Sequence, residues 1–406
     1  MQTEFGRGDI TDAGSTARSV AIANRPESTR VVQVCLGFQT GGTPLAVAQF
    51  SRVFGGWVIY FGDQQASRIV DSALHIPVGS GPAAAKFSWV NSRSLAGART
   101  LLESADLIIC HALFRYHIQW AADIARRNGI PLWVVPHGSL DPWVFSYRSF
   151  QKKLWMRLFG NAILSSATAV LCATRREAAK AALLGLPMNS RIVMWAAEAP
   201  VGTTPASRRE EIRQKLGILP SDRVLLFLGR LHEMKRPLET IRALKLSGAE
   251  NVHLMVIGGD ETISAGDCRS LSSELGIAAR VHVLGPLFGA EKWDHIAAAD
   301  GYISLSRREN FGYTVAESLM AARPLILSPG NDLGGELENV GCGWLLKTDE
   351  EQEAADAIRE FALLGIAELR ASGEKGQAWA RSHLSPENLN ASLTGLLAET
   401  TSLRND

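Results

Sequence analysis

Short apolar runs alternate along this chain with longer segments in which apolar residues recur every three or four positions. In the first half the runs read as strands: Val31–Gly37, Trp57–Phe61, Asp106–Cys110, Leu132–Val135, Ala169–Cys172 and Arg191–Trp195. In the second half they are Arg223–Leu228, Val252–Ile257, Arg280–Leu284, Gly301–Leu305, Pro324–Leu327 and Trp344–Leu346. Helical patterns such as Ile118–Arg127 lie between them. This alternation predicts βαβ units and parallel sheets.

The alternation of predicted strands and helices is interrupted once, at Ala196–Pro220, which contains three prolines and a short charged helix. We therefore predict an α/β protein with two doubly wound, Rossmann-like domains, at 31–200 and 223–385, joined by a linker at 201–222. Charges are spread through residues 1–30, which we expect to form a disordered tail. A last helix, 386–402, begins where Ser385 suits the N-cap and Pro386 the first turn, and we expect it to pack back on the first domain.

Composition narrows the classes of function. The 42 basic and 41 acidic residues nearly cancel, which excludes a global basic field for nucleic acid. Hydrophobic residues make up 46% and charged residues 20%, as in an ordinary globular protein. No apolar run reaches the ~18 residues of a membrane span, and no signal-peptide core is visible. We expect a cytoplasmic protein.

Residues that could bind a ligand follow the predicted strands of the first half. Gly41 and Gly42 lie at the turn from the first strand into a helix, where backbone N–H groups can approach an anion. His111 follows the strand ending at Cys110, and His137 and Gly138 follow the strand ending at Val135. In parallel sheets ligands bind outside the carboxyl ends of the strands, so these positions are candidates for binding residues.

The second half has a more specific pattern of charged residues in the loops after its predicted strands. Gly229 and Arg230 follow a strand, and Lys235 precedes a helix, so two cations and a helix dipole can meet one anion. Glu309 would lie at the tip of a later loop, and Glu317 about two turns into the helix that follows. The two carboxylates are spaced to reach different parts of one long ligand.

The ordered motifs resemble those of retaining glycosyltransferase family 4 (group 1), which has the GT-B fold. Glu309-x7-Glu317 with Asn310-Phe311-Gly312 is similar to the E-x7-E signature of that family, and Gly229-Arg230-Leu231 with Lys235 is similar to its phosphate loop. Pro136-His137-Gly138 and Gly41-Gly42 match in order and spacing. The resemblance covers about residues 31–400.

The resemblance implies a donor site for a nucleoside-diphosphate sugar in the second domain. Arg230 and Lys235 would pair with the diphosphate, Glu317 with the ribose hydroxyls, and Glu309 with the donor sugar. His111 would lie near the reacting sugar. The remaining substrate-binding positions would be Gly41, Gly42, His137, Gly229, Leu287, Asn310, Phe311, Gly312 and Tyr313. The acceptor would be a glycan or a lipid-linked sugar in polysaccharide biosynthesis.

No D-x-D motif occurs, although this motif is the usual means of placing a metal on a sugar-nucleotide diphosphate. We therefore expect neither a metal nor another cofactor, and the nucleotide sugar is a co-substrate. By resemblance, retention needs no protein nucleophile, because a phosphate oxygen of the leaving group can take the proton of the acceptor.

Other functions stay open. A non-catalytic sugar-nucleotide-binding scaffold and a GT-B epimerase share the expected donor site. A Rossmann oxidoreductase would use the loose GxGxxA at Gly79–Ala84, which does not follow the first strand.

Membrane contact is a separate hypothesis for residues 147–159. Tyr147, Phe150, Leu154 and Leu158 form one helical stripe, with Arg148, Lys152, Lys153 and Arg157 across the other arc. Such a helix suits an anionic membrane surface, whereas its alternative is a helix packed on the core with a solvated face.

Overall fold

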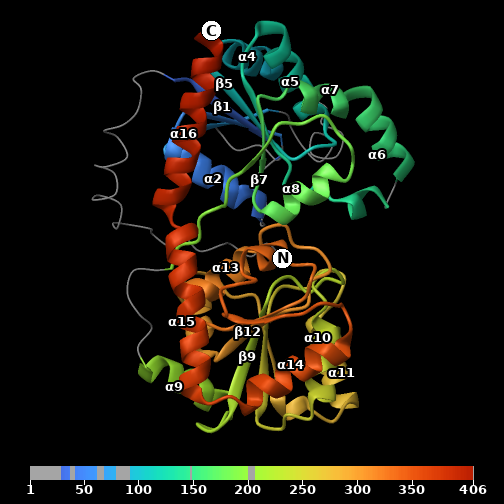
Figure 1. Ribbon diagram of the computed structural model, residues 1–406, viewed down its shortest axis with the longest axis vertical. Coiled ribbons are helices and arrows are strands. Elements are labelled where there is room, and N and C mark those ends of the chain that lie inside the picture. Colours follow the sequence, from blue (N-terminus) through green and yellow to red (C-terminus); the bar gives the residue numbers. More distant parts are fainter. Residues whose placement is uncertain are drawn as a thin grey trace.

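Two parallel sheets form two lobes that are stacked along the long axis of the molecule (Figure 1). The computed structural model describes residues 29–36, 42–61, 68–78, 92–146, 149–199 and 206–405. Most of the predicted tail, Gly41, part of the predicted linker and the Gly79–Ala84 loop lie outside these residues.

The first lobe holds an eight-stranded sheet with the order β3-β4-β2-β1-β5-β6-β7-β8. Its strands are β1 (Val31–Cys35), β2 (Trp57–Tyr60), β3 (Arg68–Val70), β4 (Ala73–Pro77), β5 (Leu107–His111), β6 (Leu132–Val135), β7 (Ala169–Cys172) and β8 (Ser190–Ile192). All pairs are parallel except β3 with β4. The strand order reverses between β1 and β5, so a crevice is expected at their carboxyl ends.

The second lobe holds a parallel six-stranded sheet with the order β11-β10-β9-β12-β13-β14. Its strands are β9 (Arg223–Leu228), β10 (Val252–Ile257), β11 (Val281–Gly285), β12 (Gly301–Ser304), β13 (Leu325–Leu327) and β14 (Gly343–Leu345). The order reverses between β9 and β12. The loops after these two strands carry the phosphate-loop motif and the first glutamate of the E-x7-E motif, so this switch point lies under the predicted donor site.

Helices cover both sheets. In the first lobe they are α2 (Gly42–Phe54), α4 (Ser92–Glu103), α5 (Tyr116–Asn128), α6 (Ser149–Trp155), α7 (Asn161–Ser166) and α8 (Arg175–Ala182). A 3-10 turn, η1 (Pro142–Phe145), precedes α6, and a π-helical turn, η2 (Met156–Gly160), follows it. In the second lobe they are α9 (Ala206–Lys215), α10 (Pro237–Ser247), α11 (Ala265–Glu274), α12 (Gly289–Ala298), α13 (Tyr313–Met320), α14 (Glu351–Leu363) and α15 (Ile366–His383), with the 3-10 turns η3 (Ala278–Arg280) and η4 (Asp332–Glu336).

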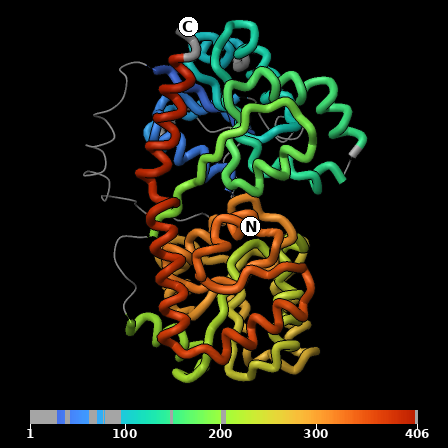
Figure 2. Tube along the Cα trace, in the orientation of Figure 1, coloured from blue at the N-terminus to red at the C-terminus, as the bar shows by residue number. Residues whose placement is uncertain are grey.

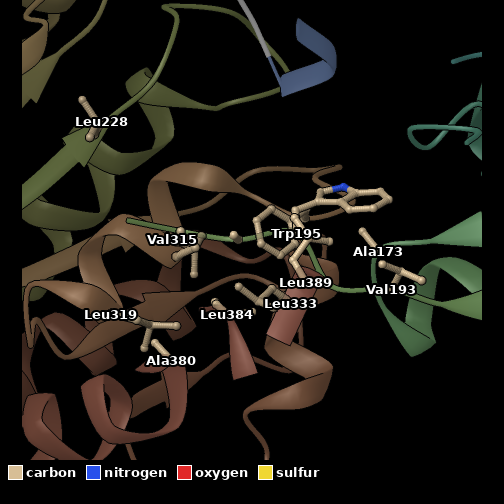
Figure 3. Close-up of a cluster of buried hydrophobic side chains, with 14 of the residues drawn as sticks. Ala173, Val193, Trp195, Leu228, Val315, Leu319, Leu333, Ala380, Leu384 and Leu389 are labelled. Atoms are coloured by element: carbon tan, nitrogen blue, oxygen red, sulfur yellow. The ribbon is translucent and has the colours of Figure 1, made fainter. Parts of the chain in front are cut away.

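The chain crosses between the lobes twice, and the two crossings touch. After α15 the last helix, α16 (Pro386–Asn405), runs along the first lobe (Figure 2). There Trp133 donates its indole N–H to the Thr400 hydroxyl at 3.1 Å. Near the first crossing, the Ala197 N–H donates to the Leu384 carbonyl at 2.8 Å. Trp195, Leu384 and Leu389 belong to one buried hydrophobic cluster that joins the lobes (Figure 3).

The strands predicted from apolar runs are found, most within one residue at each end, because the central strands of both sheets are buried throughout. The hairpin β3–β4 was not predicted. It is short, carries Arg68 and ends at Pro77, and therefore lacks the apolar run of the others. The Ser385 hydroxyl accepts the Asn388 N–H at 3.2 Å, as a helix cap does.

The apolar stripe of residues 147–159 faces solvent rather than the core. Phe150, Leu154 and Leu158 are 78%, 44% and 58% exposed. The core side is formed instead by Met156, which is buried, and by Trp155, whose ring meets Phe114 edge-on at 5.1 Å. Tyr147 and Arg148 lie outside the described residues. Within the part of the chain that the structure describes, no helix is long and apolar enough to span a membrane.

Candidate active site

The phosphate-loop motif is built where β9 ends. The Gly229 N–H donates to the Ile257 carbonyl at 2.9 Å, which continues the pairing of β9 with β10 into the loop. A Cβ at Gly258 would overlap the Gly229 carbonyl oxygen, so a glycine at 258 lets the two loops approach. The loop ends at Arg236, which has φ +58° and precedes α10. Sequence reasoning missed Gly258, whose role depends on the neighbouring strand.

Two cations of this loop are paired with carboxylates. The Lys235 ammonium contacts the Glu309 carboxylate, and each side chain is only 19% exposed. Arg230 is paired instead with Glu261 at 2.6 Å and is 61% exposed. Burial and the neighbouring Arg230 guanidinium lower the pKa of Lys235 to about 8, and the nearby Glu261 carboxylate partly offsets this fall. The structure therefore places the predicted Lys235 and Glu309 together and Arg230 beside them.

The Glu309 loop is fixed from both sides. The Glu309 N–H donates to the Gly330 carbonyl, and the Glu309 carbonyl accepts the Asp332 N–H, both at 2.8 Å. Gly312 has φ +74° and caps α13, a left-handed conformation that glycine adopts at low cost. Because α13 begins at Tyr313, Glu317 lies just over one turn into the helix rather than two turns as expected.

Glu317 has a partner that the sequence did not reveal. Lys292, on α12, donates to its carboxylate at 2.6 Å. Burial raises the pKa of the Glu317 carboxyl, and the Lys292 ammonium partly offsets this rise. Lys292 lies in an ordinary amphipathic helix, so only the packing of α12 beside α13 could reveal it.

Other predicted donor residues surround this pair of glutamates. Phe311 is buried, and its ring meets Tyr313 edge-on at 5.0 Å. The Tyr313 hydroxyl is buried and makes no hydrogen bond in the structure as described. Leu287 is half-buried in the loop between β11 and α12.

The two predicted histidines meet in the first lobe. His111 is the last residue of β5 and is fully buried, and its Nδ1 lies 3.0 Å from His137 Nε2. Its Nε2 lies 3.0 Å from the Gln33 carboxamide oxygen. Burial lowers the pKa of His111 well below its usual value and that of His137 to about 3, so both rings are neutral.

The lobes touch at predicted residues. A Cβ on Gly42, the first residue of α2, would lie 3.3 Å from the Tyr313 ring. A Cβ on Gly138 would lie 3.3 Å from Asn310. Asn310 is also 3.5 Å from Glu177, a buried carboxylate that accepts the Gly138 and Ala173 N–H groups, each at 2.7 Å. Burial raises the pKa of Glu177 to about 7, although these N–H groups oppose the rise. Sequence reasoning did not single out Glu177.

Ion pairs along α8 hold one side of the two lobes together. Lys180 contacts Asp332 of the second lobe at 2.7 Å and Asp141 of its own lobe at 3.1 Å. Arg175 contacts the buried Glu336 at 2.6 Å. The interface therefore has charged contacts at α8 and η4 in addition to the contact of Gly42 with Tyr313.

A large cavity in the described part of the chain lies away from this site. It measures about 1370 Å³, and its lining, which includes Arg209, Arg323 and Arg370, contains none of the predicted site residues. Among the described residues, no group of three or more His, Cys, Asp or Glu side chains is arranged to hold a metal ion. The expectation that no metal is needed stays a prediction.

Two family models match the chain along its length. The model of the glycosyl transferases group 1 matches residues 208–379, and that of the glycosyl transferase 4-like domain matches residues 25–196. The chain belongs to the group 1 glycosyltransferases. With its two facing α/β lobes, this group 1 glycosyltransferase has the GT-B fold.

Curated relatives include D-inositol 3-phosphate glycosyltransferases. That of Rhodococcus jostii is 29% identical over 162 residues, which are 38% of this chain and 35% of the relative. That of Mycobacterium tuberculosis is 30% identical over 181 residues, 44% of this chain and 36% of the relative. The chain thus spans about a third of the length of these relatives.

Similar solved structures support the fold. The Anabaena protein HepE in complex with UDP and glucose has a TM-score of 0.73 at 18% identity, covering 92% of this chain and 100% of that chain. Sucrose-phosphate synthase from Thermosynechococcus elongatus has a TM-score of 0.71 at 16% identity, covering 93% of this chain and 100% of that chain.

Proposed function

We propose that this group 1 glycosyltransferase is a retaining enzyme that moves a sugar from a nucleoside-diphosphate sugar to a glycan or lipid-linked acceptor. The observation that carries the proposal is the contact of Lys235 with Glu309 at the switch point between β9 and β12, with Arg230 beside it. Family membership and the UDP-glucose bound to the similar HepE structure support a nucleotide-sugar donor.

Diphosphate binding would replace the carboxylate partners of the two cations. Lys235 would turn from Glu309, and Arg230 from Glu261, toward the phosphate oxygens, releasing Glu309 for the donor sugar. The buried Tyr313 hydroxyl, which has no acceptor within the described residues, would gain one in a ligand oxygen. Glu317 would accept hydrogen bonds from the ribose hydroxyls.

Bond cleavage leaves negative charge on the β-phosphate of the donor. Arg230 and Lys235 would stabilise that charge where it develops, and Glu309 would stabilise the positive charge of the sugar ring. The acceptor attacks from the face that the phosphate leaves, and a phosphate oxygen takes its proton. Orientation of donor and acceptor between the lobes supplies a further part of the rate.

The decisive experiment incubates the protein with UDP-, GDP- and ADP-glucose and measures nucleotide release and calorimetric binding. We expect one donor to bind and to release its nucleoside diphosphate, slowly with water alone. Lys235→Ala should abolish this release. Lys215→Ala, which changes an exposed lysine paired with Glu211, is the matched control.

The alternatives give different results. Binding without any release indicates a scaffold, and sugar interconversion without release indicates an epimerase. With an acceptor found, the anomeric configuration of the product by NMR tests retention. Release that persists in EDTA supports the absence of a required metal.

Membrane contact through residues 149–159 is a second proposal, favoured by the exposed apolar stripe. Lys153 and Arg157 are exposed beside Phe150 and Leu158, whereas Lys152 is turned to the Val144 carbonyl at 2.6 Å. We expect co-sedimentation with anionic vesicles at low salt, lost in Phe150→Ser/Leu158→Ser. Leu183→Ser, just after α8 and also 78% exposed before substitution, should bind as the wild type does. Binding that is absent, or insensitive to Lys153→Glu/Arg157→Glu, contradicts the proposal.

A further inference from the structure

A chain of polar side chains runs from helix α2 through the first sheet to the lobe interface. Gln33, in the middle of β1, is fully buried between valines. Its amide nitrogen donates to the Ser51 hydroxyl at 2.9 Å, and its oxygen lies 3.0 Å from His111 Nε2. A glutamine in a buried strand costs stability unless its amide is satisfied at both ends, and here it is.

The direction of every hydrogen bond in this chain follows from Ser51. Its hydroxyl donates to the Val47 carbonyl at 2.9 Å, one turn back along α2. A serine has one proton to donate, so Ser51 must accept from the Gln33 NH2 group. The Gln33 oxygen therefore faces His111, and the hydrogen must lie on His111 Nε2.

The tautomer of His111 in turn fixes the tautomer of His137. A neutral imidazole with its hydrogen on Nε2 has a lone pair on Nδ1, so His111 Nδ1 accepts from His137 Nε2 at 3.0 Å. His137, neutral as well, is left with a lone pair on its own Nδ1. That atom makes no hydrogen bond to any residue the structure describes.

The position of His137 suits a ligand between the lobes. The residue is partly exposed and has φ +50°, at the carboxyl end of β6. Its neighbour Gly138 lies against Asn310 and Arg308 of the second lobe, next to the glutamate proposed to hold the donor sugar. A group bound at His137 would therefore lie beside the donor sugar.

We propose that Gln33 and Ser51 are positioning residues that fix both histidine tautomers, so that His137 Nδ1 accepts a hydrogen bond from a hydroxyl of the sugar acceptor. The role in transfer rests on the proposed function, whereas the tautomers do not. A neutral nitrogen with a lone pair binds a hydroxyl donor and disfavours an anionic group at the same point. For a sugar acceptor this is a hydroxyl next to the reacting one, whose single proton goes to the phosphate oxygen. A water molecule can donate one hydrogen to His137 Nδ1 and the other to the phosphate oxygen.

The tautomers are measured without substrate, by long-range ¹H–¹⁵N correlation on the full chain labelled with ¹⁵N-histidine. We expect both His111 and His137 to carry hydrogen on Nε2, with assignments from His111→Gln and His137→Gln. Gln33→Leu removes the acceptor and should shift or mix the tautomers of both rings. Gln33→Glu retains an oxygen toward His111 and should keep the wild-type pattern. Gln49→Leu, the same change on α2 at a glutamine bonded to Ala196, should alter neither ring.

The second measurement uses water as the smallest hydroxyl acceptor. In hydrolysis of UDP-glucose, or of whichever donor in the panel is hydrolysed, Gln33→Leu should lower kcat about tenfold and leave the donor KM within about twofold, as expected for one lost hydrogen bond to the nucleophile. Circular dichroism checks that each variant folds, and Gln33→Glu should restore most of the rate.

Two results overturn the inference. One is hydrogen on Nδ1 of His111 in the wild type, and the other is an unchanged kcat in a folded Gln33→Leu whose tautomers have shifted. A protein that hydrolyses no donor contradicts the proposed function instead, and the NMR measurement still decides the tautomers.

Discussion

The candidate site residues of the two lobes differ in their polar chemistry. In the second lobe the candidate residues are charged and paired: Lys235 with Glu309, Arg230 with Glu261, and Lys292 with Glu317. In the first lobe Gln33, Ser51, His111 and His137 form a neutral, hydrogen-bonded chain. One lobe is therefore suited to an anionic ligand and the other to uncharged hydroxyls.

Each lobe satisfies its buried polar groups with partners from the chain itself, but in a different way. A half-buried cation without a partner is costly, and a carboxylate that a ligand can displace reduces that cost. Neutral groups cost less to bury, so a fixed chain of hydrogen bonds suffices. The substitutions that follow alter the ion pairs of the second lobe.

Of the four changes that follow, Glu309→Gln is expected to have the largest effect. Glu309 is assigned to the sugar ring that becomes cationic in the transition state, so its loss should lower kcat about 100-fold or more. Steady-state kinetics with the identified donor measures this, and circular dichroism confirms folding. A wild-type kcat would show that the assignment of this glutamate is wrong, and would favour the scaffold or the epimerase.

A pH effect of about tenfold per unit is expected from Lys235. Its pKa is lowered to about 8, so the cation proposed to bind the diphosphate is present below that pH and is lost above it. Donor kcat/KM should therefore fall tenfold per pH unit above about pH 8. Lys235→Arg, whose side chain stays charged, should move this limb out of range. A limb that is the same in both proteins would assign it to another group.

Glu317→Gln should act on donor binding rather than on the chemical step. A hydrogen bond to a charged acceptor contributes about 1.5–3 kcal/mol, so we expect donor KM to rise about tenfold or more with kcat little changed. Lys292→Met leaves Glu317 buried without its cation, and should raise donor KM in the same direction. An effect on kcat alone in both variants would contradict the ribose assignment.

The smallest effect is expected from Glu261→Gln. This pair is solvent-exposed, with Arg230 61% and Glu261 38% accessible, and such pairs contribute about 0–1 kcal/mol. Removing the carboxylate that competes for Arg230 should lower donor KM about twofold. Arg230→Gln in the same background should abolish the gain, and a raised KM in the single variant would give Glu261 a direct role with the donor.

The sequence predicted one lobe of the site better than the other. In the second lobe, Lys235 and Glu309 lie in the loops that follow Arg223–Leu228 and Gly301–Ser304, two neighbouring buried strands, so topology brings the two side chains together. In the first lobe, Gln33 stands out in the sequence because it is a polar residue within an apolar strand. Nothing in the sequence, however, shows which groups form hydrogen bonds with its buried amide.

Partners that come from another element could not be predicted. Lys292 and Glu177 are ordinary charged positions on amphipathic helices, and their contacts depend on how those helices pack. The exposed stripe of Phe150 and Leu158 has the spacing of a core face, and only the packing of Trp155 and Met156 shows that the opposite side is buried.

The double crossing of the chain near Trp195 and Leu384 limits the kinematics of the molecule. Because the two chain crossings lie next to each other, the lobes can hardly slide past one another. They can still rotate about the point where the crossings touch. Movement of one lobe against the other would then be a rotation about the joint formed by Ala197 and Leu384, in which residues far from it move furthest. The last helix contains none of the predicted site residues, yet it is anchored to the first lobe by Trp133 and Thr400, so we expect its removal to give the lobes more freedom to move.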